Sequence, residues 1–303
     1  MISQEHTLLV VTGPTAVGKT ELTIRLSEHF QTEIISADSR QFYQEMSIGT
    51  AKPTSEELAR AKHHFIHSHT IKQPLTVGQY EPEALQLIEE RFQKHKLLIL
   101  TGGSGLFIDA VCKGMDPLPS SDPKLREEIT QRWKTDGIEW LQNKLQSLDP
   151  EYFAQVDQAN PHRLIRGIEV CLLSGKTFSE LRSNQNQKRP FRTLKVLLNR
   201  EREELYDRIN RRVDIMAEQG LEEEAKALLP YRDLPPLQTV GYREFFDYFD
   251  GKCTRKEALD MIRQNSRRYA KRQLTWFRRD ETYQSFHPDQ YSDILQWIEN
   301  QLN

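Results

Sequence analysis

The sequence predicts an α/β fold in which a parallel sheet is flanked by helices and the chain carries an all-helical insertion. Three observations lead to this fold class. Short apolar runs alternate with helical patterns in the first part of the chain, the middle part is helical throughout, and a strand-like run returns after it. We therefore expect residues 1–115 and 190–303 to form one core domain and residues 116–189 to form the insertion.

The first part of the chain supplies three strands and two helices. Residues 8–11 and 97–100 are apolar runs typical of buried strands, and residues 33–36 form a third strand. Apolar residues recur at helical spacing in 21–30 and 82–94. Because ligands bind beyond the carboxyl ends of the strands in open α/β sheets, the turns after these strands are the expected place of a functional site.

The rest of the chain is mainly helical. A turn-rich stretch at 116–123 precedes helical patterns from 124 to about 181, and residues 191–199 look like a strand. Helical patterns then return at 203–229 and 256–279. The simplest account of a strand after a purely helical stretch is that helices are inserted between two parts of one α/β domain.

Composition excludes several classes of protein. The chain has 303 residues, with 42 Lys and Arg against 44 Asp and Glu. Its apolar runs are too short for a membrane helix, which needs about 20 residues, and no basic segment precedes them as in a secretory signal. Three widely spaced cysteines fit neither a disulfide framework nor paired zinc ligands, and the histidines between 63 and 69 lack ligand spacing. We expect a cytoplasmic protein without membrane contact, and a monomer by default.

A phosphate-binding motif follows the first strand. Residues 13–20 match GxxxxGK[ST] and lie between a predicted strand and a predicted helix. Its glycines let backbone N–H groups face phosphate oxygens, Lys19 would contact phosphate, and the Thr20 hydroxyl would face Mg²⁺. The motif does not identify the phosphate donor. The candidate phosphate-binding residues are Gly13, Pro14, Thr15, Ala16, Val17, Gly18, Lys19 and Thr20.

Asp38 follows the second strand. A carboxylate at this place could deprotonate an acceptor or help to hold a metal ion, although Asp is also common in turns and helix caps. The strand at 97–100 does not end in the acidic residue that nucleotide-hydrolysing proteins of this kind usually carry. It runs instead into the Gly-rich residues 101–105, which could form a simple turn or bring the backbone close to a ligand.

Basic residues gather on the last long helical pattern. Residues 255–279 contain nine Lys or Arg and two acidic residues, an excess that suits RNA and is also found on solvated helix faces. One stripe of this helix is expected to face the core, and it consists of Leu259, Ile262, Tyr269 and Trp276. Two further basic pairs share a helix face, Arg163 with Arg166 and Arg208 with Arg212.

A set of motifs resembles those of the bacterial tRNA dimethylallyltransferases, also called tRNA isopentenyltransferases. In order along nearly the whole chain, they are residues 13–20, 38–41, 48–53, 102–106, 160–166, 174–177, 240–243 and 271–278. The resemblance implies a P-loop NTPase-like core with a helical insertion, in agreement with the predicted fold. Two positions depart from the family. Val17 stands where the family often has Ser, and Ser104 stands where it usually has Thr. Neither change is expected to abolish activity.

The resemblance implies transfer of a dimethylallyl group from dimethylallyl diphosphate to N6 of the adenosine on the 3′ side of the anticodon. No nucleotide would be hydrolysed, which would explain the missing strand-end acid. Asp38 would be the general base, Thr15 and Arg212 would act on the departing diphosphate, and Thr20 would bind Mg²⁺. The residues expected to contact the anticodon stem-loop of tRNA are Asp38, Ser39, Arg40, Gln41, Ser104, His162, Arg163, Leu164, Ile165, Arg166, Arg267 and Lys271.

Two other functions compete with this interpretation. A small-molecule kinase would use the phosphate loop for ATP, but the missing strand-end acid and the basic helix argue against it. An RNA-binding switch driven by nucleotide would make RNA affinity depend on ATP and not on dimethylallyl diphosphate.

Overall fold

The chain divides into two compact units. The computed structural model describes residues 6–182 and 187–302. The first unit combines Met1–Cys112 with Arg189–Asn303, and the second unit consists of Lys113–Lys188.

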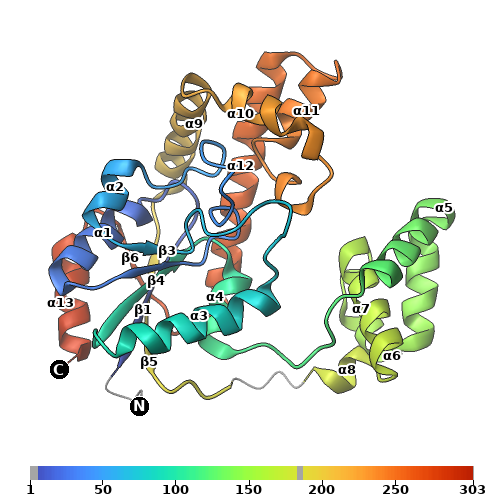
Figure 1. Cartoon of the computed structure of the whole chain (residues 1–303), viewed down its shortest axis with the longest axis horizontal. Helices are drawn as coiled ribbons and strands as arrows, with labels where there is room; N and C mark the ends of the chain where they lie inside the picture. The colour runs from blue at the N-terminus through green and yellow to red at the C-terminus, as the bar shows by residue number, and fades with distance from the viewer. Residues whose placement is uncertain (1–5, 183–186, 303) are drawn as a thin grey trace. The chain divides into compact units, whose positions relative to one another are not determined.

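A parallel sheet forms the centre of the first unit (Figure 1). In the described residues six strands pair in the order β3-β2-β4-β1-β5-β6, and every pairing is parallel. The strands are β1 Thr7–Thr12, β2 Ile34–Ser36, β3 His63–His64, β4 Leu97–Gly102, β5 Arg192–Leu198 and β6 Gln284–Phe286. In the central register Leu9 lies opposite Ile99 on β4 and Leu194 on β5. The predicted parallel α/β sheet is confirmed.

Helices cover both faces of this sheet. The described helices of the first unit are α1 Lys19–Phe30, α2 Ser55–Arg60, α3 Val77–Phe92, α4 Gly105–Lys113, α9 Arg202–Glu218, α10 Leu221–Leu228, α11 Arg243–Phe249, α12 Arg255–Phe277 and α13 Tyr291–Leu302, with 3₁₀ turns η1 Leu229–Tyr231 and η2 Pro235–Leu237. Leu9 and Val11 share one apolar cluster with α1 and α13, whereas Leu8 and Val10 share another with α3 and α4. Because both faces are covered, β1 is apolar at successive positions and does not alternate.

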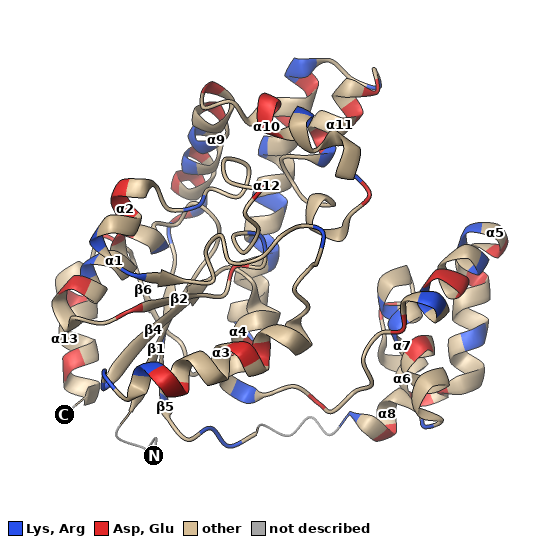
Figure 2. Cartoon of the chain, in the orientation of Figure 1, with Lys and Arg blue, Asp and Glu red and all other residues tan. Residues whose placement is uncertain are grey.

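A third apolar cluster joins α9, α10, α11 and α12 to the loop after β2. The predicted helical stretch 203–229 contains two helices because Gly220, at φ 99°, separates α9 from α10. Glu224 on α10 accepts hydrogen bonds of 2.9 Å from the backbone N–H groups of residues 47–49, and the Tyr242 hydroxyl donates to it at 2.6 Å. This carboxylate therefore fixes the loop that follows the Asp38 segment, which consists of residues 38–41. Figure 2 shows the Lys and Arg positions that recur along α12.

The second unit contains the helices α5 Pro123–Leu148, α6 Pro150–Gln155, α7 Pro161–Ser174 and α8 Phe178–Leu181. Its apolar core includes Leu141 and Leu145 of α5 and Ile168 of α7. Gly137, at φ 79°, interrupts the helical geometry of α5. The buried Glu169 carboxylate on α7 pairs with Arg126 and Arg166, and so ties α5 to α7 by charge as well as by packing.

Candidate active site

The loops at the carboxyl ends of the strands line a cavity of about 950 Å³. Its walls come from the phosphate loop after β1, the Asp38 segment after β2, the Gly-rich turn after β4, and side chains of α9 and α12. All of these residues belong to the first unit. The cavity lies at the sheet edge where the turn residues predict a functional site.

The phosphate loop curves around the N-terminus of α1. Gly13 and Gly18 adopt φ angles of 150° and 114°, in the range that favours glycine. The Lys19 ammonium group donates to the carbonyl oxygens of Gly13 and Pro14, both at 2.9 Å, so this side chain folds back over its own loop. The Val17 side chain is fully buried and packs in the apolar cluster that contains Leu9 and Val11.

Three charged groups act on one another across the cavity. Burial of the ammonium group lowers the pKa of Lys19 to about 8, while the Asp38 carboxylate raises it and the Arg212 cation lowers it. Burial also lowers the pKa of Arg212 to about 10, with Asp38 opposing the effect and Arg208 adding to it. An anion between these cations would offset the loss of hydration, so the cavity suits a diphosphate.

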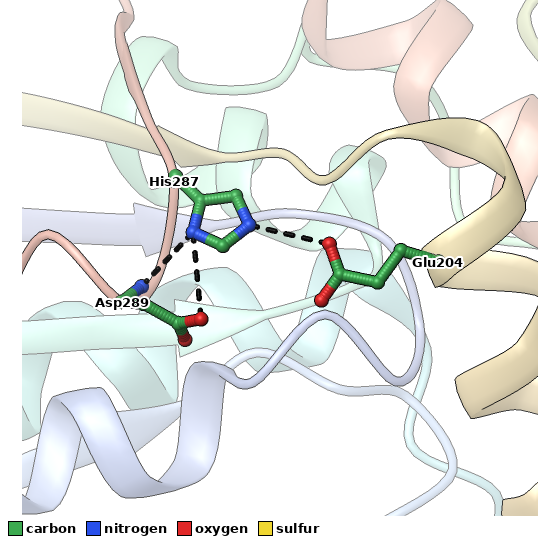
Figure 3. A group of neighbouring side chains, drawn as sticks. All are labelled: Glu204, His287 and Asp289. Carbon is green, nitrogen blue, oxygen red and sulfur yellow. Dashed lines mark hydrogen bonds and ion pairs between the residues drawn. The ribbon is translucent and has the colours of Figure 1, made fainter.

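Arg200 holds the phosphate loop from the connection between β5 and α9. Its Nε donates to the carbonyl oxygen of Val17 at 2.9 Å, and its Nη2 lies 2.7 Å from Oδ1 of Asp289. Asp289 belongs to a group with Glu204 and His287 in which one ligand atom of each residue lies within 4.8 Å of the others (Figure 3). These residue types can bind metal ions, but here the Arg200 guanidinium contacts all three. The group therefore balances the charge of Arg200.

The Asp38 segment is tied to the Gly-rich turn after β4. The Arg40 N–H donates to Oδ1 of Asp38 at 3.1 Å. The Ser39 N–H donates to Oγ of Ser104 at 3.0 Å, and the Ser104 hydroxyl donates to Oγ of Ser39 at 3.0 Å. Gln41 donates to two carbonyl oxygens of the loop before α2, at 3.2 and 3.1 Å. The structure thus brings the predicted residues of both turns to one wall of the cavity.

The aromatic stripe on α12 departs from its expected role. Leu259 and Ile262 are buried in the apolar core, as predicted. Tyr269 instead lines the cavity, and Trp276 both lines the cavity and packs against the apolar cluster of α3 and α4. Burial raises the pKa of Tyr269 to about 12, and the Asp38 carboxylate adds to this rise. The helix that carries the basic residues is therefore also a wall of the site.

Several residues expected to contact tRNA lie away from this cavity. Arg267 donates to Oδ1 of Asn210 at 2.6 Å and its guanidinium lies 5.9 Å from the centre of the Tyr206 ring, so its charge is engaged within the fold. Lys271 is exposed on α12. In the second unit, His162 is exposed in the first turn of α7.

The structure corrects the expectation that Leu164 and Ile165 contact RNA. Both side chains are buried in the core of the second unit, because successive residues of a helix point in different directions and these two face α5. Arg166 pairs with the buried Glu169 at 3.0 Å. These three side chains stabilise the helix, while Arg163 beside them is exposed.

Comparison with known proteins identifies the family. The family model described as IPP transferase matches residues 41–280. The chain belongs to this family. As a member of the IPP transferase family it is a transferase, and the resemblance found in its motifs is confirmed. The matched range begins after the phosphate loop and Asp38.

Similar proteins cover nearly the whole chain. The tRNA dimethylallyltransferase 1 of Phocaeicola vulgatus is 49% identical over 292 residues, which are 96% of this chain and 97% of that protein. The tRNA dimethylallyltransferase 1 of Bacteroides thetaiotaomicron is 47% identical over 96% of this chain and 95% of its own length.

Solved structures of the family share the fold. The full-length tRNA isopentenylpyrophosphate transferase of Bacillus halodurans aligns with a TM-score of 0.73 and 37% identity, over 98% of this chain and 97% of that one. A eukaryotic dimethylallyltransferase acting on tRNA aligns with a TM-score of 0.76 and 27% identity, over 89% of this chain and 69% of that one.

Proposed function

We propose that this enzyme transfers the dimethylallyl group of dimethylallyl diphosphate to N6 of the adenosine that follows the anticodon of tRNA on its 3′ side, and releases diphosphate. One observation carries the proposal. A single cavity joins a phosphate loop with the half-buried cations Lys19 and Arg212 to the carboxylate of Asp38. The relatives named as tRNA dimethylallyltransferases match this chain over nearly their full length, which supports the same reaction.

In the proposed reaction, the lone pair of N6 forms a bond to C1 of the dimethylallyl group. The bond between C1 and the diphosphate oxygen breaks, and its electron pair leaves with the diphosphate. Asp38 takes the proton from N6, so the product is a neutral secondary amine. Lys19 and Arg212 stabilise the charge that grows on the leaving oxygen, and Thr15 in the phosphate loop helps to bind the diphosphate.

The oxygen donors of the site fit a magnesium ion. The Thr20 hydroxyl and the Asp38 carboxylate line the same cavity, and Mg²⁺ prefers few protein oxygens together with phosphate oxygens and water. Thr20 would hold the ion. When bound, Mg²⁺ would neutralise part of the diphosphate charge.

The proposed RNA partner is the anticodon stem-loop of tRNA. The cavity is large enough to admit a nucleotide that has left its stack, and the Ser39, Arg40 and Gln41 segment would hold the adenosine there. Lys271 of α12 and Arg163 of α7, both exposed, would contact phosphates. We propose that the enzyme acts as a monomer in the cytoplasm, where its tRNA substrate is found. In the described ranges 6–182 and 187–302, no helix has the length and apolar character to cross a membrane.

The direct test is incubation with Mg²⁺, labelled dimethylallyl diphosphate and unmodified tRNA, followed by mass spectrometry of nuclease fragments. We expect one five-carbon unit on the adenosine after the anticodon. Label that stays off the RNA, together with transfer of the γ-phosphate of ATP to a small acceptor, would establish the kinase. An RNA affinity that responds to ATP and not to dimethylallyl diphosphate would favour the switch.

Replacing Lys271 with Ala should weaken tRNA binding and lower the slope of log affinity against log salt concentration by about 1, because one phosphate contact is lost. Lys256→Ala is the matched control, since Lys256 is exposed near the start of the same helix. Filter binding across a salt series measures both slopes. A Lys271→Ala slope equal to that of the unchanged protein would assign the α12 charge to a solvated helix face.

Raising the pH through about 8 should reduce kcat/KM for dimethylallyl diphosphate. Lys19, with its pKa lowered to about 8, is a cation below that pH and becomes neutral above it, so its attraction for diphosphate is present at lower pH and lost at higher pH. Lys19→Arg should remove this alkaline limb, because a guanidinium stays charged. The kcat/KM profile from pH 6.5 to 9.5 tests this, and a limb that persists in Lys19→Arg would assign the titration to another group.

A further inference from the structure

Gln273 lies on the buried side of α12, where its amide joins the two Gly-rich turns of the site. Its side chain is 5% exposed. Its Oε1 accepts a hydrogen bond from the Thr15 N–H at 2.9 Å, and its Nε2 donates to the carbonyl oxygen of Gly103 at 2.8 Å. One amide therefore uses its acceptor on the phosphate loop after β1 and its donor on the turn after β4.

The turn after β4 is shaped to receive this amide. A Cβ atom added at Gly103 would lie 2.2 Å from Nε2 of Gln273, which no real contact allows. A carboxylate in place of the amide could accept from Thr15 but could not donate to the Gly103 carbonyl. An apolar side chain would leave both backbone groups without this partner in a buried place. Only a group that is donor and acceptor at once satisfies both turns.

The two turns that Gln273 connects have different roles in the proposed reaction. Thr15 belongs to the loop that binds the leaving diphosphate. On the other side, Ser104 follows Gly103, bonds to Ser39, and so adjoins the turn that carries Asp38. The distance between the two turns therefore decides how the leaving group is aligned with the general base.

We propose that Gln273 is a positioning residue that sets this distance, and so aligns the dimethylallyl diphosphate with the amine that attacks it. Gln273 also lines the cavity, but both ends of its amide are bonded to Thr15 and Gly103, so it acts through these two turns. The inference rests on the proposed function. Misplacing reactants by about 1 Å can cost roughly 100-fold in rate, so loss of the amide should act mainly on kcat.

The first test compares Gln273→Leu with Gln264→Leu, in which an exposed Gln on the same helix is replaced. We expect Gln273→Leu to lower the single-turnover rate by about 10- to 100-fold, with tRNA affinity unchanged, and Gln264→Leu to match the wild type. Equal rates in the two variants would overturn the inference and leave the proposed function intact. A wild-type protein that transfers no dimethylallyl group would contradict both.

Two further variants test the inference independently if Gln273→Leu folds poorly. Gln273→Glu should be slow at pH 8 and recover as the pH falls, because only the protonated acid can donate to the Gly103 carbonyl. The recovery should be measured relative to the wild-type rate at each pH. Gly103→Ala, which displaces the amide, should be no more harmful in a Gln273→Ala background than that change alone. A flat pH profile for Gln273→Glu, or additive losses in the double variant, would contradict a positioning role.

Discussion

Replacing Asp38 with Asn should lower the single-turnover rate of dimethylallyl transfer by about 10²–10⁴-fold, the range that a general base contributes. Asn has the shape of Asp, and its side-chain oxygen can still accept the Arg40 N–H, which Oδ1 of Asp38 accepts at 3.1 Å. The turn should therefore survive while the group that takes the N6 proton is lost. Because we expect tRNA to be held mainly through its phosphates, its dissociation constant should change little.

The matched control for this experiment is Asp207→Asn. Asp207 is exposed on α9, pairs with Arg211 and lies outside the cavity. Rapid-quench measurements with saturating tRNA separate the chemical step from product release. An Asp38→Asn enzyme with a near-normal single-turnover rate would exclude Asp38 as the base, and a parallel loss in Asp207→Asn would indicate a general effect of removing acidic charge.

Local patterns in the sequence predicted the centre of the fold. The strands β1 and β4 are continuous apolar runs because helices cover both of their faces, and the phosphate loop has a spacing set by backbone geometry. The strands β3 and β6 consist of only two and three residues, too short for an alternation to show. They are held by pairing with β2 and β5, which is a tertiary effect.

The partners of side chains within the site could not be predicted in the same way. Gln273 bonds to residues 258 and 170 positions earlier in the chain, so no local pattern distinguishes it from an exposed Gln of the same helix. Glu224 stands in a run of three consecutive Glu residues, yet only its carboxylate accepts hydrogen bonds from the backbone of residues 47–49. The sequence gives one indication that these residues matter, because Gln273 and residues 47–49 lie in or beside the family motifs.

Motifs taken as continuous blocks also overstate the number of contact residues. The block from His162 to Arg166 was expected to face RNA as a whole, but it is helical, and a helix turns by about 100° per residue. Leu164 and Ile165 consequently lie in the core. The same reasoning explains α12, where exposed Lys271 and buried Gln273 are neighbours in one motif with different roles.

Replacing Arg212 with Met should lower kcat/KM for dimethylallyl diphosphate by about 10²–10³-fold, because a preorganised cation beside the leaving group is lost. Met keeps much of the length and apolar volume of the Arg stem. Arg211→Met is the matched control, since Arg211 precedes Arg212 on α9 and lines the same cavity, but is exposed and pairs with Asp207. Steady-state rates at varied dimethylallyl diphosphate, with saturating tRNA, measure the effect. Similar losses in both variants would argue against a specific role for Arg212.

The Arg212 variant also tests the charge coupling inside the cavity. Arg212 lowers the pKa of Lys19, which is about 8 in the intact site. Without the guanidinium, the Lys19 ammonium should keep its proton to higher pH, and the alkaline limb of kcat/KM should move upward even though the overall rate has fallen. A limb that stays in place would show that Lys19 and Arg212 do not share one anion site. A shift in the expected direction, absent from Arg211→Met, would tie both cations to the same diphosphate.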